Sequence, residues 1–301
     1  RSQQLNLDET FIAQGTLRPD LIESGNKDIS DFASKIKTHH NDVEIIREQR
    51  KKKLIVETNK DLHKDEVRRL ARDLGLPPEI SERQPFPGPG LSVRILNRNH
   101  MPDQDWVSAE TAFSNIMQGA SEKARLTPVE TVGVQGDGRS YRYLAVMYDG
   151  NPYEWDQIRH RCKRIIDKVD FINRVGIVLS GHRWDQALFV FCCHLDDATV
   201  SLAQEVDDSV RAIFDRHKVT ENTSQILSVL LPLNTTGRSE FSVGIRVFMT
   251  NDYMTGTPAP LGSTIPQACM EEIRSYVESH QLLDMLIYDA TSKPPATTEW
   301  Q

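Results

Sequence analysis

A repeated pattern in the later part of the chain constrains its fold more than any other feature. The segment 132–134 (Val-Gly-Val) recurs 111 positions later at 243–245 (Val-Gly-Ile). The same shift carries an apolar helix face around Cys162 and an apolar strand around Ile172 onto matching patterns. One shift that aligns a strand, a helix and a second strand indicates a duplicated unit. We therefore expect two related sheet-and-helix subdomains.

The apolar spacing around the repeats predicts an α+β fold, with the repeats at about 91–181 and 182–301 and with a helical, lid-containing segment before them. Period-two patterning predicts strands and a 3.6-residue period predicts helices. The predicted strands are 91–96, 131–134, 141–147, 174–179, 188–193, 226–231, 242–249 and 283–288, and the predicted helices are 109–123, 155–169, 198–216 and 267–280.

Residues 1–90 differ in pattern from the rest of the chain. A helix is expected at 63–74, because its apolar residues share one face and Gly75 and two prolines follow it. The polar stretch 25–42 is long for a simple connector and indicates either a lid or disorder. The run 85–90, with three prolines and two glycines, predicts a rigid turn. We place a domain boundary there, between 1–90 and 91–301.

Composition excludes several classes of protein. The 301 residues carry a net charge of −7, which argues against a broad nucleic-acid or anionic-membrane surface. The apolar runs are strand-length, far short of the ~20 residues that a membrane span needs. The four cysteines show no paired-ligand spacing, which favours buried thiols in a reducing compartment, the cytosol. The chain begins Arg-Ser-Gln-Gln without methionine, and we expect a fragment.

The carboxyl end carries the first candidate site. Lys293 precedes two prolines, which pre-set the backbone and reduce the entropy lost on ordering. An ammonium, two threonine hydroxyls and the Glu299 carboxylate suit a phosphate and a sugar. The alternative is a frayed polar terminus.

Three further clusters are candidates. Asp137 and Arg139 lie in a glycine-containing corner after a buried strand, where an arginine can hold a phosphate or stack on a base; the alternative is a surface turn. Asp20 and Glu23 share one helical face, suited to magnesium or to a nucleophile, or are simply exposed. The lid, residues 36–42, combines a lysine, a hydroxyl, two imidazoles and an amide, either to close over a polyphosphate or as a solvated loop. Its candidate residues are Lys37, Thr38, His39, His40 and Asn41.

The sequence lacks both common phosphate-binding glycine loops and a nucleophile elbow, and its histidines and cysteines have no metal-ligand spacing, so no metal site is assigned. The basic run 50–53 is expected to be a solvated surface.

Several segments in order resemble the glutamine-hydrolysing GMP synthetases, and the long form with a doubled C-terminal region resembles the animal type. These segments are Phe11–Ser24, the lid, His63–Arg68, Pro85–Leu91, Val132–Arg139, Phe248–Gly256 and Lys293–Trp300. The resemblance covers essentially the whole chain.

The resemblance implies a ligase of purine biosynthesis. In that family a glutaminase domain releases ammonia, an ATP-pyrophosphatase domain uses Mg²⁺-ATP to adenylate XMP, and ammonia then displaces AMP to give GMP. Residues 1–90 would be the end of the pyrophosphatase domain and 91–301 the dimerisation and XMP-binding domain. Partners would be XMP or GMP, a second copy of the chain, and the upstream domains, which would bind most of the ATP and Mg²⁺.

The resemblance also implies roles for individual residues. Asp137, Arg139, Gln225, Lys293 and Glu299 would bind XMP, with Lys293 facing the phosphate. The lid residues, Asp20 and Glu23 would serve adenylation or amination. Gln84 and Gln301 depart from the family pattern, and the glutaminase and the pyrophosphate loop are absent from this chain, so alone it would not make GMP. The alternatives are a dimerisation module whose nucleotide site needs upstream residues and a divergent regulator without catalysis.

Overall fold

The computed structural model describes residues 10–18, 44–81, 83–84, 86, 90–135, 138–250 and 255–301. The chain divides into two compact units, Arg1–Arg83 and Gln84–Gln301, and each is described by itself. The division falls just before the proline-glycine run. Among the described residues no helix is both long enough and apolar enough to span a membrane.

The first unit contains short elements. Strands β1 (Ile12–Ala13) and β2 (Ile55–Val56) pair in parallel, and the helices are α3 (Glu44–Lys51), α4 (Lys64–Asp73) and α5 (Pro78–Ser81). The predicted helix at 63–74 is confirmed as α4. The backbone N–H of His63 donates to the Glu66 carboxylate at 2.8 Å, which caps its first turn. Gly75, at φ 77°, follows its end.

The basic run at 50–53 is not wholly a solvated surface. Lys51, Lys52 and Lys53 are exposed. Arg50, however, donates from Nε and Nη2 to both carboxylate oxygens of Glu57, at 2.9 and 2.7 Å. Thr16 donates to the same carboxylate at 2.6 Å. This bidentate ion pair joins α3 to the segment after β2, a geometry that arginine makes and lysine does not.

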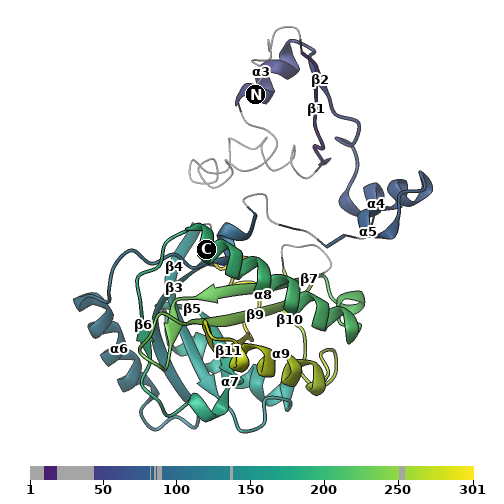
Figure 1. Cartoon of the computed structure of the whole chain (residues 1–301). Helices are drawn as coiled ribbons and strands as arrows, with labels where there is room; N and C mark the ends of the chain where they lie inside the picture. Colours follow the sequence, from purple (N-terminus) through teal and green to yellow (C-terminus); the bar gives the residue numbers. More distant parts are fainter. Residues whose placement is uncertain are drawn as a thin grey trace. The chain divides into compact units, whose positions relative to one another are not determined.

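The second unit is built on one sheet (Figure 1). Its long strands lie in the spatial order β3 (Lys123–Gln135), β4 (Gly138–Tyr148), β5 (Ile172–Val178), β11 (Leu283–Asp289), β9 (Phe241–Met249) and β7 (Gln225–Leu231), with β10 (Thr257–Pro258) also paired to β9. The β4–β5 and β11–β9 pairs are parallel, and the β3–β4, β5–β11 and β7–β9 pairs are antiparallel.

The duplication is present in this sheet. Each repeat runs helix, two antiparallel strands, helix, strand, and the helices are α6 (Gln104–Met117) and α7 (Trp155–Lys168) in the first repeat, α8 (Asp197–Arg216) and α9 (Gln267–Ser279) in the second. Ile177 in β5 pairs with Tyr288 in β11, which is the same position of the other repeat. The two subdomains therefore share one sheet, related by a pseudo-twofold axis between β5 and β11.

One part of the predicted repeat alignment is wrong. The shift of 111 positions matches α7 to α9 and β5 to β11, as expected. It also matched β3 to β9. In the sheet, however, β9 is the parallel neighbour of β11, as β4 is of β5, so β4 is the equivalent strand. A period-two apolar pattern fits either strand of a hairpin, so the pattern alone did not distinguish them.

The two faces of the sheet are covered differently. Along β4, Ala145 and Met147 pack in a cluster with buried residues of all four long helices, so α6–α9 cover one face. Leu144 and Val146 point to the other face, in a second cluster that includes Trp300. Alternating side chains of a strand reach opposite faces, so both faces of this sheet are apolar and buried. The carboxyl end of the chain therefore covers the face without helices.

Some predicted elements differ in the structure. The predicted strand at 91–96 is wrong: Gly90–Arg94 forms the 3-10 helix η1, and only Ile95 bridges to Leu230. The predicted strand at 188–193 shortens to β6 (Phe189–Val190), paired with β8 (Leu233–Asn234). Helix α6 begins earlier than the predicted 109–123 because Asp103 caps it, and it ends earlier, at Met117, before β3 begins at Lys123. Two more 3-10 helices are η2 (Gly181–Arg183) and η3 (Thr220–Asn222).

Candidate nucleotide-binding site at the carboxyl end

The last residues of the chain are ordered against the sheet. Lys293 and Gly256 exchange two backbone hydrogen bonds, of 2.9 and 3.1 Å. Further along, the N–H of Val134 donates to the Pro295 carbonyl at 2.8 Å and the N–H of Val132 donates to the Trp300 carbonyl at 2.9 Å. We call residues 290–301 the tail. It pairs with the end of β3, directly before the glycine corner that the sequence singles out.

Arg174 holds the tail in place. Its side chain is fully buried, and Nη2 donates to the carbonyls of Thr297, at 2.9 Å, and Glu299, at 2.5 Å. Its guanidinium also lies 4.9 Å from the centre of the Trp300 ring. These contacts satisfy two carbonyls of partly buried tail residues, and they stack a cation on an aromatic face. Arg174 thus fixes the path of the tail over four residues.

Asp289 forms ion pairs with two buried arginines at once. Its Oδ2 accepts from Arg174 Nη1 at 2.6 Å and from Arg246 Nη1 at 2.7 Å, and all three side chains are inaccessible to water. Burial by itself would raise the pKa of Asp289, but the charges of Arg246 and Arg174 outweigh it and the pKa is lowered. Burial lowers the pKa of Arg174 to about 10. The group is a charged triad in the centre of the fold.

A third buried arginine reaches the end of the tail. Arg94, 1% exposed, lies 3.5 Å from the Glu299 carboxylate through Nε and 3.3 Å from Asp207 through Nη1. Ser228 also donates to Asp207, at 2.6 Å. Burial raises the pKa of Glu299 although Arg94 opposes this shift. The Glu299 carboxylate therefore sits in a site where its charge is only partly compensated.

Gly133 is required where the tail, β3 and β5 meet. A Cβ at Gly133 would lie 2.4 Å from Asn173 Oδ1. The Asn173 amide donates to the Thr131 carbonyl at 2.7 Å and to the Ser140 carbonyl at 3.1 Å, which joins the two strands of the hairpin. A side chain at Gly133 would displace this amide.

We expect Gly133→Ala to lower the free energy of unfolding by about 1–3 kcal/mol, the usual cost of forcing extra atoms into a packed site. The measurement is urea denaturation followed by circular dichroism. Gly150→Ala is the matched control, because nothing lies within 4 Å of a Cβ there. Equal midpoints for the two variants would contradict the prediction.

The structure places four of the predicted XMP-binding residues. Lys293 is half-buried and its Nζ donates to Thr298 Oγ1 at 3.1 Å. Glu299 lies beside Arg94, as above. Gln225 is buried at the start of β7, opposite Phe248. Arg139 is exposed at the start of β4, opposite Val134.

The remaining predicted site residues lie outside the described part of the chain. They are Asp20, Glu23, Lys37, Thr38, His39, His40, Asn41 and Asp137. Their roles stay predictions. Within the ranges that the structure does describe, no group of three or more His, Cys, Asp or Glu side chains is arranged to hold a metal ion.

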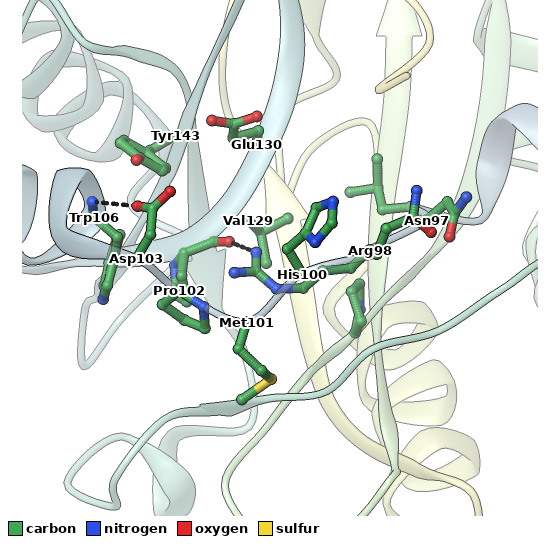
Figure 2. Close-up of a pocket in the computed structure, with 14 residues that line it drawn as sticks. Asn97, Arg98, His100, Met101, Pro102, Asp103, Trp106, Val129, Glu130 and Tyr143 are labelled. Carbon is green, nitrogen blue, oxygen red and sulfur yellow. Dashed lines mark hydrogen bonds between the residues drawn. The ribbon is translucent and has the colours of Figure 1, made fainter.

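Two cavities lie elsewhere in the second unit. One, of about 270 Å³, is drawn in Figure 2. It is lined by residues 96–103 and 128–130 together with Trp106, Tyr143 and Pro232. The other, of about 520 Å³, lies between the end of β4 and α9. Neither is lined by Arg139, Gln225, Lys293 or Glu299. The predicted XMP-binding residues therefore do not gather around either of these cavities. Lys293 and Glu299 lie on the tail, and Arg139 lies opposite Val134, whose N–H donates to the tail.

The four cysteines are free thiols, and three of them are buried, as expected. Burial raises the pKa of Cys269 to about 12, so that its thiol stays protonated at neutral pH. Cys192 differs from the expectation because it is exposed.

The buried charges were not identified from the sequence. Arg94, Arg174, Arg246 and Asp289 each stand inside a run predicted as strand or at its end. A signal was present: a charge within an otherwise apolar strand requires a buried partner. The sequence does not show which partner, because Arg174 and Asp289 lie 115 positions apart.

A family profile described as "GMP synthase C terminal domain" matches residues 212–300. Residues 212–300 form a GMP synthase C-terminal domain. The match begins in the last turn of α8 and ends at Trp300, so it contains Arg246, Asp289 and the tail up to Trp300. The resemblance seen in the sequence is confirmed.

Relatives of the GMP synthase domain match nearly the whole chain. A GMP synthase [glutamine-hydrolyzing] of Dictyostelium discoideum is 34% identical over 98% of this chain and 47% of its own length. A probable GMP synthase of Caenorhabditis elegans is 33% identical over 99% of the chain and 49% of its own length. A probable GMP synthase of Leptospira interrogans is 32% identical over 99% of the chain and 48% of its own length. The chain therefore spans about half the length of the curated relatives it matches.

Proposed function

We propose that the chain is the XMP-binding C-terminal part of a GMP synthase and that it mediates homodimerisation. The observation that carries the proposal is the tail: it pairs with β3, is held by Arg174, and carries Lys293 and Glu299 on a fixed backbone. Pre-ordering of a binding segment reduces the entropy lost when a ligand binds. A cation and a carboxylate six residues apart on that segment suit the two ends of a mononucleotide.

The proposed roles follow from charge. Lys293 binds the phosphate of XMP, and Glu299 accepts a hydrogen bond from a ribose hydroxyl or a ring N–H. Asp137, Arg139 and Gln225 complete the site. Arg139 is exposed beside the strand that the tail pairs with, so its guanidinium is free to approach a ligand held there.

In the whole enzyme, ammonia from glutamine replaces the O2 oxygen of XMP after that oxygen has been adenylated, which releases AMP and gives GMP. ATP and Mg²⁺ supply the activation, and we assign them mainly to the part of the enzyme that corresponds to the length of the relatives beyond this chain. The lid residues, Asp20 and Glu23 would support that step. We place the protein in the cytosol, where its free thiols stay reduced.

The test is isothermal titration of the 301-residue chain with XMP. We expect saturable binding at one site per chain, and no binding of CMP, a pyrimidine nucleotide with the same phosphate and ribose. A folded sample that releases no saturable heat with XMP, with and without Mg²⁺-ATP, would overturn the proposal.

Lys293→Ala is expected to weaken XMP binding by about 1.5–3 kcal/mol, the effect of losing a charge-assisted hydrogen bond. The measurement is the same titration. Lys163→Ala is the control, because Lys163 is exposed on α7 and pairs only with Asp167 among the described residues. Equal affinities for the Lys293 variant and the unmodified chain would show that the tail does not hold the phosphate.

Glu299→Gln should separate stability from binding. Because the folded-state pKa of Glu299 is raised, its contribution to stability is present at low pH and is lost as the pH rises through that pKa. At pH 7 the variant should therefore be at least as stable as the unmodified chain, while XMP binding weakens by about tenfold or more. Thermal melts at pH 5 and 7 and titration with XMP check both parts. A less stable variant with unchanged affinity would contradict both.

A second candidate function is a dimerisation module whose nucleotide site needs upstream residues. It is favoured by one observation: the predicted XMP-binding residues line neither of the two cavities described above. Analytical ultracentrifugation separates the two candidates. A dimer that forms equally with and without XMP, together with no heat of XMP binding, would favour this second function.

A further inference from the structure

The cavity drawn in Figure 2 contains opposite charges that do not pair with each other. It holds about 270 Å³, and Arg98, Asp103 and Glu130 all line it. Among the described residues none of these three forms an ion pair within 4 Å. The cavity lies wholly within the second unit and is separate from the tail.

Arg98 has hydrogen-bond donors that no described residue accepts from. Its backbone is fixed by two hydrogen bonds with Cys193, of 3.2 and 3.0 Å. Its Nη1 donates to the Pro128 carbonyl, while Nε is buried without an acceptor in the part of the chain that the structure describes. Burial also lowers the pKa of Arg98. A ligand cannot reach the buried Nε, but Nη2 has no acceptor among the described residues, and a carboxylate is an anion that a guanidinium N–H binds well.

Two aromatic rings and two carboxylates also line the cavity (Figure 2). Trp106 and Tyr143 meet edge to face with ring centroids 5.3 Å apart. One Asp103 oxygen accepts from the backbone N–H of Trp106 at 3.1 Å, which fixes this carboxylate at the start of α6. Glu130 is exposed and neighbours Tyr143, and its negative charge adds to burial in raising the pKa of the Tyr143 hydroxyl. Carboxylates beside aromatic rings favour an ammonium group.

We propose that this cavity binds a small α-amino acid as its zwitterion. The carboxylate of the ligand pairs with Arg98, and its ammonium group lies between Asp103 and Glu130 beside Tyr143. A ligand that carries both charges compensates Arg98 as well as the two carboxylates, whereas a phosphate would be repelled by the two carboxylates. The volume also suits a small ligand, because it is below the ~300–1,000 Å³ of pockets for drug-sized molecules.

The test uses L-alanine, propionate and ethylamine as probes of the 301-residue chain. Propionate lacks the ammonium group and ethylamine lacks the carboxylate. The readout is the indole N–H resonance of Trp106, identified by its loss in Trp106→Phe. We expect a saturable shift with L-alanine and binding at least roughly tenfold weaker for each of the other two, since each forms only one of the charge-assisted contacts.

Two variants and two controls decide the outcome. Arg98→Gln and Glu130→Gln should each weaken L-alanine binding by about tenfold or more. Arg159→Gln and Glu110→Gln change exposed residues outside the cavity and should leave it unchanged. No saturable shift, equal binding of propionate, or unchanged affinity in both cavity variants would overturn the proposal. If Arg98→Gln fails to fold, Glu130→Gln decides, because Glu130 is exposed.

Discussion

Replacing Asp289 with asparagine is expected to lower the free energy of unfolding by about 3–5 kcal/mol, the cost of leaving buried charges without their partner. Asp289 accepts from two arginines, and all three side chains are fully buried. Asparagine keeps the volume but removes the negative charge, so Arg174 and Arg246 would face each other uncompensated. Urea denaturation followed by circular dichroism measures the loss.

The control is Asp167→Asn. Asp167 pairs with Lys163 at 2.6 Å on the exposed surface of α7, and such pairs contribute about 0–1 kcal/mol. A loss for Asp289→Asn no larger than that for Asp167→Asn would show that the triad does not stabilise the fold.

The lowered pKa of Asp289 also predicts that the stability of the chain depends on pH. Its folded-state pKa is lowered below the ordinary value of about 4, so its contribution is present above that value and is lost as the pH falls through the folded-state pKa. The stability of the unmodified chain should therefore fall in acid more steeply than that of Asp289→Asn. Parallel slopes of stability against pH below pH 5 would contradict the lowered pKa.

Trp300→Ala is expected to cost about 3–5 kcal/mol and to release the tail. The ring is fully buried in the apolar cluster on the face of the sheet without helices. It also lies so close to Gly244 that a Cβ there would be 3.1 Å from it. Loss of the ring removes the packing that holds the end of the tail, so XMP binding should be lost as well.

Amide hydrogen exchange distinguishes release of the tail from general loss of stability. The N–H groups of Val132 and Val134 donate to tail carbonyls, so they should exchange quickly in Trp300→Ala while amides between β5 and β11 stay protected. Deletion of the exposed Gln301 is the control and should change neither. Continued protection of Val132 and Val134 in Trp300→Ala would mean that other contacts hold the tail.

Local patterns predicted most of the regular structure in the second unit. Helices α7, α8 and α9 and strands β5, β7, β9 and β11 lie within one or two residues of their predicted bounds. These elements carry long apolar repeats of period 3.6 or 2, and such repeats depend only on neighbours in the chain. The strand predicted at 91–96 is wrong because Gly90, at φ 76°, begins a 3-10 helix that runs to Arg94.

The candidate site was predicted less completely. Lys293 and Glu299 were chosen for their charge and for the prolines between them, and the tail that carries them is ordered. Arg94 and Arg174, which contact that tail, were not chosen, because nothing near them in the chain marks their partners. Gln84 was noted only as a departure, yet its side chain bonds Thr220, Thr223 and Ile226 at the start of β7.

The sequence by itself determined most of the helices and strands of the second unit, that a unit is duplicated, and which family the chain resembles. Only the tertiary structure decided which strands are neighbours, where the tail lies, and which buried charges neutralise one another. The physical reason is the distance along the chain over which each kind of interaction acts. Backbone preference and apolar period act over a few residues, whereas pairing of Arg174 with Asp289 and of Val132 with Trp300 depends on how distant segments pack.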